Sequence, residues 1–184
     1  MGQVNTAELR ENNLSILKEE RLPMENFRKG GTAPTETLRA GVAGFLFDAD
    51  AETLVIQFCV PKDWKPSDII IELHCVLAAV ETANDLIDWE TSVVSIADHE
   101  DVDVAPVQTP GAAHNIGAVT AAGSMHNVDI TLDYDDGTCP IAAGDNVSLS
   151  LSRTANVGAA GYVAGVILID ICLEYQANKL GEPV

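Results

Sequence analysis

The chain has 184 residues, a formal net charge of −18 at pH 7, 47% hydrophobic residues and 5% aromatic residues. This length and apolar fraction suit one globular domain with a mainly aliphatic core. The charge argues against nucleic acid and anionic lipid as direct partners, because both are polyanions that an acidic body repels. We therefore expect a protein that binds no nucleic acid and no membrane.

The charge is unevenly distributed along the chain. Residues 1–40 carry six basic and six acidic residues, whereas the rest of the chain carries four basic and twenty-two acidic residues. All the net charge thus lies on the second part. We expect an N-terminal arm over 1–40, a folded body over 41–178 and a C-terminal tail over 179–184.

The first predicted element lies in the arm. Residues 7–22, AELRENNLSILKEERL, have a helix-forming composition, and Pro23 would end or kink a helix there. Residues 27–37 read as an extended linker. Because this segment is too short to own a core, we expect an extended, partly helical arm that docks on neighbouring subunits. The residues expected to make these contacts are Leu9, Leu14, Ile16, Leu17, Leu22, Phe27 and Arg28.

Short hydrophobic runs follow, separated by turn signals. Several alternate with a period of two, as strands with one buried face do. One such face joins Val147, Leu149 and Leu151. No helical pattern separates the runs, which disfavours a parallel α/β fold and predicts an all-β sandwich or barrel. The predicted strands span 41–48, 52–60, 69–80, 87–97, 114–122, 126–134, 147–154 and about 162–176.

The last run, GVILIDICLEYQ at 165–176, is the clearest case. A membrane helix needs about 20 apolar residues without charges, and this stretch contains Asp170 and Glu174. If the stretch is a strand, alternate residues point to opposite faces. Asp170 and Glu174 then both lie on the outer face, and neither needs a catalytic role. The row expected to face inward is Ile167, Ile169, Ile171, Leu173 and Tyr175.

Candidate metal ligands are sparse. Glu72 and His74 lie two residues apart on one predicted strand and could share a face. Two ligands fall short of the three that a catalytic metal site usually needs. We therefore expect no cofactor and no catalytic metal.

A second candidate for a cation is the acidic stretch DYDDGT. Asp133, Asp135 and Asp136 resemble the start of a calcium loop, but no Glu follows at the required distance. A hairpin turn at Asp136-Gly137 explains the stretch without a cation, and calcium is the alternative.

The remaining candidate residues are cysteines, nucleophiles and tryptophans. Cys59, Cys75, Cys139 and Cys172 form no CxxC pair, and we expect them to be free and buried. The sequence has neither a nucleophile elbow nor a phosphate-binding glycine loop, so we expect no catalytic residues. Trp64 lies in a predicted turn, where an exposed ring could stack on a sugar.

Several segments together carry a family resemblance. They are TETLRAGVAGFLFD, FCVPKDWKPSD, IIIELHCVL, PIAAGDNVSLSLSRT and GVILIDICLEYQ. This order of strands and turns resembles the single-jelly-roll structural proteins of tailed bacteriophages, over roughly residues 36–176. The resemblance implies an antiparallel jelly-roll sandwich of about eight strands and a role in the virion, commonly as a homotrimer. It implies no active-site residues.

The expected function is that of a non-enzymatic virion structural protein. The most specific expectation is a capsid decoration (cement) protein on the outer surface of the head, a homotrimer that contacts the major capsid protein or other virion subunits. The alternative is a tail-fibre or receptor- and glycan-binding jelly-roll module with Trp64 in its site. A cupin-like metalloenzyme is the third hypothesis.

Overall fold

The structure is a computed structural model that describes residues 15–23, 26–49, 52–81, 85–101, 107–117, 120–154 and 161–178. The strands are β1 (Ser15–Arg21), β2 (Phe27–Lys29), β3 (Thr35–Arg39), β4 (Val42–Phe47), β5 (Thr53–Cys59), β6 (Ile69–Leu77), β7 (Leu86–Ile96), β8 (Val107–Gln108), β9 (Gly111–Asn115), β10 (Met125–Leu132), β11 (Asn146–Thr154) and β12 (Val166–Asn178). No helix in these ranges is long and apolar enough to cross a membrane.

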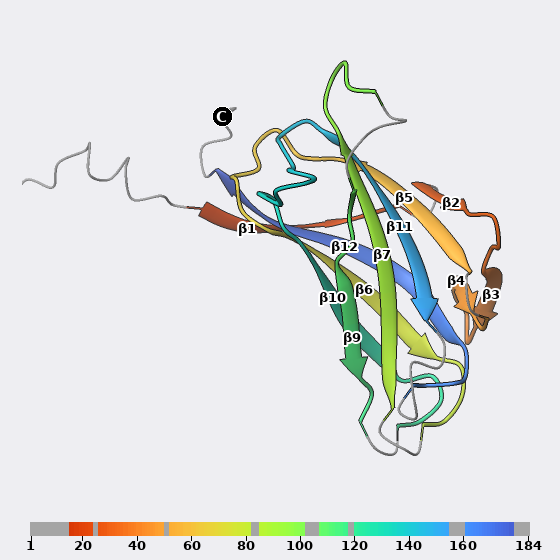
Figure 1. The fold of residues 1–184 in the computed structure, drawn as a ribbon. Helices are drawn as coiled ribbons and strands as arrows, with labels where there is room; N and C mark the ends of the chain where they lie inside the picture. The colour runs from red at the N-terminus through yellow and green to blue at the C-terminus, as the bar shows by residue number, and fades with distance from the viewer. Residues whose placement is uncertain are drawn as a thin grey trace, which may run out of the picture.

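The strands form two antiparallel sheets that pack face to face (Figure 1). Sheet A has the order β10-β6-β12-β4-β3, with β1 also paired to β12. Sheet B has the order β2-β5-β11-β7-β8, with β9 also paired to β7. The chain passes repeatedly between the sheets, as in a jelly roll. This confirms the all-β, antiparallel jelly-roll sandwich.

Eight of these strands correspond to the eight predicted runs: β4 to β7 and β9 to β12. The fifth run is the least accurate, because a strand was expected over 114–122 and β9 is Gly111–Asn115. Strand β8 and most of β9 therefore lie between the predicted strands 87–97 and 114–122, where no strand was expected. The hydrophobic pattern is weak there, because only Ala112 of β9 is buried.

Alternation of side chains explains the core. In β6, Ile69, Ile71, Leu73, Cys75 and Leu77 are fully buried, and the four residues between them are half-buried. The sheets meet through such rows and through aromatic contacts, among them the edge-to-face contact of Phe47 and Trp89 with ring centroids 5.0 Å apart. Such pairs add to the free energy gained by burial alone.

Strand β12 departs from simple alternation. Its register with β6 shifts between Leu168 and Asp170, which marks a β-bulge. A bulge inserts one residue and thereby exchanges the faces of the strand. Val166 and Leu168 consequently pack in the core, before the bulge. The sequence had predicted Ile167 and Ile169 there; Ile167 is buried outside the main core cluster, and Ile169 is half-buried. Beyond the bulge, the predicted inward row is confirmed: Ile171, Leu173 and Tyr175 are buried.

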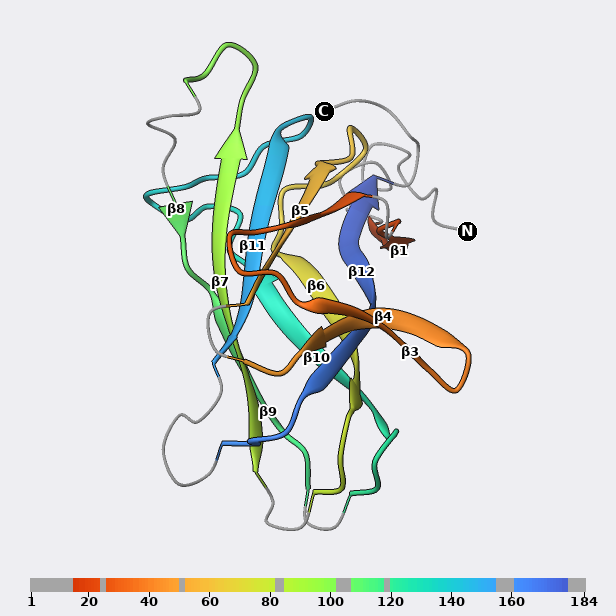
Figure 2. The same cartoon turned by 90° about the vertical axis from the view of Figure 1, so that its right-hand side faces the viewer.

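The described part of the N-terminal segment, from Ser15 onward, pairs with strands of the sandwich. The expectation of a helix is wrong for Ser15–Arg21, which form β1 and pair with β12 over Arg21↔Cys172 to Ser15↔Asn178. Strand β2 pairs with β5, and β3 pairs with β4. Figure 2 shows the β3–β4 hairpin at the side of the sandwich. Composition alone favoured a helix, and pairing with a long strand decided otherwise.

The residues predicted as arm contacts divide into three groups. Leu22 and Phe27 lie in the core of their own chain, which corrects their expected role at another subunit. The Leu22 amide also donates to the Ile171 carbonyl at 2.9 Å. Ile16, Leu17 and Arg28 are exposed. Leu9 and Leu14 lie outside the described residues, as does the tail over 179–184.

A buried arginine closes one end of the sandwich. Arg153, 2% exposed, donates through Nη1 to the carbonyls of Phe47 (3.2 Å) and Ala164 (2.7 Å). Its Nη2 donates to the Tyr162 carbonyl. The Tyr162 hydroxyl in turn donates to the Ala79 carbonyl at 2.9 Å. One side chain thus joins the ends of β11 and β4 to the segment that leads into β12.

We predict that Arg153→Met lowers the free energy of unfolding by about 3 kcal/mol, because carbonyls at this end lose their donor in a site that excludes water. Urea unfolding followed by circular dichroism measures the change. The control is Arg28→Met, on the exposed surface of β2, which should cost no more than about 0.5 kcal/mol. Equal losses in the two variants would contradict the role given to Arg153.

Candidate functional site

The outer face of sheet A holds a cluster of chemically active side chains. Strand pairing places Glu72 opposite Cys172, and His74 opposite Asp170. Residues in register on neighbouring strands share a face, so the four side chains lie together on β6 and β12. We refer to Glu72, His74, Asp170 and Cys172 as the sheet A cluster.

Its polar atoms are closely spaced. His74 Nε2 lies 3.1 Å from Glu72 Oε2, and His74 Nδ1 lies 3.7 Å from Asp170 Oδ2. Asn127 on β10 donates from Nδ2 to Glu72 Oε1 at 2.5 Å. Arg21 on β1 forms an ion pair with Asp170, Nε to Oδ2, at 2.6 Å. Strands on both sides therefore fix the two carboxylates around the imidazole.

Cys172 completes the cluster. Its thiol is buried, and burial raises the pKa of that thiol to about 11, with a further rise from a contact with Glu19. Ligand atoms of Glu72, His74 and Cys172 lie within 4.8 Å of one another. The sequence indicated only the Glu72–His74 pair. The third member is nearly 100 positions away along the chain, and only the β6–β12 register reveals it.

The outer face of sheet B has a different character. Its centre is formed by Val55 and Gln57 of β5, Ser148 and Ser150 of β11, and Ser92 and Val94 of β7. We call these six residues the neutral face. None is charged, Gln57 is exposed and the other five are half-buried. A neutral strip of this kind contrasts with the net charge of −18.

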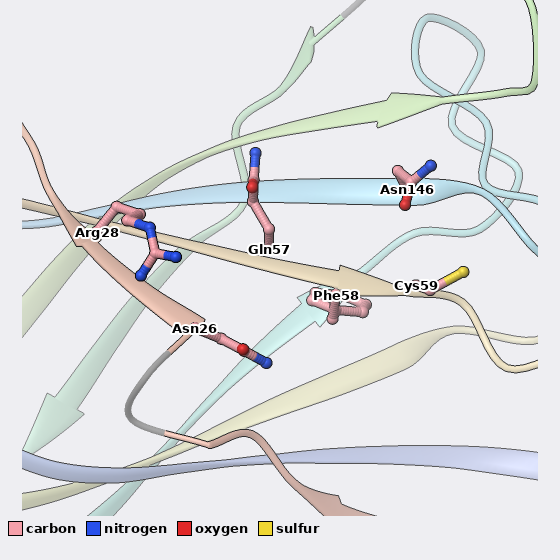
Figure 3. A pocket seen from close by; sticks show the side chains of 6 residues that line it. All are labelled: Asn26, Arg28, Gln57, Phe58, Cys59 and Asn146. Atoms are coloured by element: carbon pink, nitrogen blue, oxygen red, sulfur yellow. The ribbon is translucent and has the colours of Figure 1, made fainter.

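An open hollow of about 310 Å³ adjoins the neutral face, between β2 and the ends of β5 and β11 (Figure 3). The side chains that line it are Asn26, Arg28, Gln57, Phe58, Cys59 and Asn146. Cys59 is exposed there, which corrects the expectation that all four cysteines are buried. The reason is its outward position in β5, between the inward-facing Phe58 and Val60.

Trp64 does not have the exposed position predicted for it. The side chain is 2% exposed and makes an edge-to-face contact with Tyr134, with ring centroids 6.0 Å apart. Its turn is held on the end of β12, since the Lys65 amide donates to the Gln176 carbonyl at 2.7 Å. All nine aromatic residues of the chain lie in the described part, and none is exposed.

The three aspartates proposed as calcium candidates lie in the connection between β10 and β11. Asp133 Oδ1 accepts from the Asp135 amide at 3.2 Å, and Asp136 Oδ1 accepts from the amides of Thr138 and Cys139, each at 2.8 Å. The contact with Asp133 raises the pKa of Asp135. These carboxylates organise the turn itself. The expected hairpin at Asp136-Gly137 is wrong, because β10 and β11 belong to different sheets.

A histidine pair lies where the two sheets meet at β9 and β10. His114 Nε2 and His126 Nδ1 are 3.1 Å apart, so one ring donates to the other. Burial lowers the pKa of both rings, and the neighbouring His114 lowers that of His126 further. Asp129 acts in the opposite direction on His114. Two protonated rings would place N–H groups against each other, so the pair requires a neutral member.

We predict that the free energy of unfolding falls as the pH decreases from about 7 to about 5, because the unfolded chain protonates these rings first, near their ordinary pKa of about 6.5. The double variant His114→Gln/His126→Gln should show a shallower decline. Urea unfolding across this pH range measures it, with His99→Gln on an exposed loop as the control. An unchanged slope in the double variant would refute the assignment.

Comparisons with known proteins identify no family. No family model matches the chain, and no curated protein matches it. Among solved structures, a Clostridium thermocellum xylanase with CBM22 and GH10 modules aligns over 84% of this chain at 10% identity and a TM-score of 0.42. This chain spans only 25% of that structure's length.

Two shorter structures are covered almost completely. A xylan-binding module CBM15 aligns over 88% of this chain and 97% of its own, at 15% identity and a TM-score of 0.47. The CBM2 module of an evolved Dit protein from Lactobacillus casei BL23 phage J-1 aligns over 89% of this chain and 98% of its own, at 10% identity and a TM-score of 0.39. Carbohydrate-binding modules and a phage-associated domain are thus both among the structures similar to this chain.

Proposed function

We propose that the protein is a non-enzymatic structural subunit of a phage particle, which associates with copies of itself through the neutral face. The observation that carries the proposal is the absence of charge at the six positions of this face in a chain of net charge −18. The resemblance of residues 36–176 to phage jelly-roll structural proteins supports a place in the virion.

Electrostatics selects the neutral face for self-association. Copies of a strongly acidic chain repel one another, and burying unpaired carboxylates between them is costly. A contact through the outer face of sheet A would bury three carboxylates, those of Glu72, Asp170 and Glu174. Glu72 and Asp170 would carry their partners His74 and Arg21 into that contact. The neutral face presents small serine and valine side chains on a sheet, and the cores of protein interfaces are depleted in charge in the same way.

The specific role that we propose is capsid decoration on the outer surface of the head. A homotrimer joined through the neutral face would contact the major capsid protein and add buried surface across subunit boundaries. That added surface would offset the internal pressure of packaged DNA. Closed oligomers of sandwich domains also cover edge strands that otherwise invite uncontrolled pairing.

The arrangement of aromatic residues argues against sugar binding by ring stacking. Sugar stacking needs an exposed ring, and each of the nine aromatic side chains is buried or half-buried. Trp64, the residue expected in a glycan site, packs against Tyr134 instead.

We predict that Ser150→Glu abolishes self-association, because it places a carboxylate between Val55 and Ser92 at the centre of the contact. Sedimentation equilibrium should give three times the 19.5 kDa chain mass for the parent and one chain mass for the variant. The matched control is Thr131→Glu, exposed on β10 of sheet A, which adds the same charge and should leave the trimer intact.

Binding to particles provides the second readout of the same variants. The parent and Thr131→Glu should co-sediment with phage heads from which the decoration protein has been removed, and Ser150→Glu should bind at least about tenfold more weakly. A parent that is monomeric and does not bind heads would overturn the proposal.

Glycan binding is the second candidate, favoured by the hollow beside the neutral face. Asn26, Arg28, Gln57 and Asn146 offer amide and guanidinium groups that suit sugar hydroxyls. This candidate predicts hits on a glycan array and a loss of at least about tenfold in affinity for Gln57→Ala, measured by calorimetry. Thr131→Ala should not change the affinity, and an array without hits would remove the candidate.

A further inference from the structure

We propose that Glu72, His74 and Cys172 form a binding site for a zinc ion on the outer face of sheet A. The site is independent of the neutral face, which lies on the other sheet, and the proposal does not depend on a role in a virion. It rests on three ligand types that zinc prefers, brought together from two strands.

The geometry suits one ion. Three atoms within 4.8 Å of one another can all lie within about 2.8 Å of a common point. Zinc bonds are about 2.0 to 2.3 Å long, so a movement of about 0.5 to 0.8 Å per side chain closes the site. Side-chain rotation supplies such a movement without a change in the β6–β12 register. Water can occupy a fourth position.

The surroundings position two of the ligands. Asn127 holds Oε1 of Glu72 and leaves Oε2 directed toward His74 Nε2 at 3.1 Å. The opposite nitrogen, Nδ1, lies 3.7 Å from Asp170 Oδ2, which is close for an ion pair but too long for a hydrogen bond. A metal-binding histidine usually donates this N–H to a carboxylate, so we expect the two groups to approach when the ion binds. Arg21 in turn fixes Asp170 through its ion pair. These neighbours act as positioning residues.

The donor set selects the kind of ion. Calcium and magnesium prefer oxygen ligands, whereas a thiolate with an imidazole and a carboxylate favours zinc and cobalt. When the ion binds, the Cys172 thiol releases its proton to solvent and a metal–sulfur bond forms. Glu72 and the thiolate then balance the two positive charges of zinc, Arg21 balances Asp170, and Glu19 adds one more carboxylate beside Cys172. The bound ion would join β6 to β12.

The test uses cobalt(II) as a spectroscopic probe and zinc as a competitor, on the full chain carrying Cys59→Ser so that no exposed thiol interferes. We expect one cobalt per chain, a sulfur-to-cobalt charge-transfer band, and loss of that band when one equivalent of zinc is added. Zinc should also raise the midpoint of thermal unfolding. The charge-transfer band and the rise in the unfolding midpoint should both be absent in Cys172→Ser and in His74→Gln.

Matched controls separate this site from other histidines. His99→Gln, on an exposed loop, and His126→Gln, in the histidine pair, should bind cobalt as the reference protein does. Circular dichroism verifies that each variant is folded. If Cys172→Ser is unstable, His74→Gln provides the test instead, because His74 is only half-buried. A folded reference protein without a charge-transfer band, or a band that persists in Cys172→Ser, would overturn the proposal.

Discussion

Strand β12 makes more strand pairings than any other described strand of sheet A. It pairs with β6 along one edge, and with β4 and β1 in succession along the other. The bulge between Leu168 and Asp170 allows both halves of the strand to direct apolar side chains into the core. A slip of one residue in this register would expose the core row and separate the sheet A cluster, so burial and the cluster are fixed by the same hydrogen bonds.

The outer faces of the two sheets carry different kinds of side chain. Sheet A carries carboxylates, an imidazole and a thiol, with Arg21 supplied by the N-terminal strand β1. Sheet B presents serine, valine and glutamine at its centre. In a strongly acidic chain this division leaves one outer face whose centre carries no charge and one that carries several carboxylates.

The residues that carry the resemblance to phage jelly rolls have structural explanations. Gly144 adopts a φ of +90°, which a side chain would strain, and Asp145 accepts from Ser95 Oγ at 3.0 Å and from the Ala142 amide at 2.8 Å. Arg153 closes one end of the sandwich, and Trp64 covers part of the core at the turn beside the end of β12. These positions specify how turns and sheet ends are closed. Because these residues have structural roles, the sequence pattern predicts a fold and does not point to an active-site residue.

Alternation is a local property, so the amino-acid sequence alone predicted eight of the described strands and the inward row of Val147, Leu149 and Leu151, which is buried as predicted. Tertiary structure decided what depends on distant partners. Pairing with β12 makes Ser15–Arg21 a strand, and Trp64 is buried. The bulge places Val166 and Leu168 in the core, and the β6–β12 register places Cys172 beside Glu72 and His74. Pairing between remote segments sets each of these outcomes, and no local periodicity encodes that pairing.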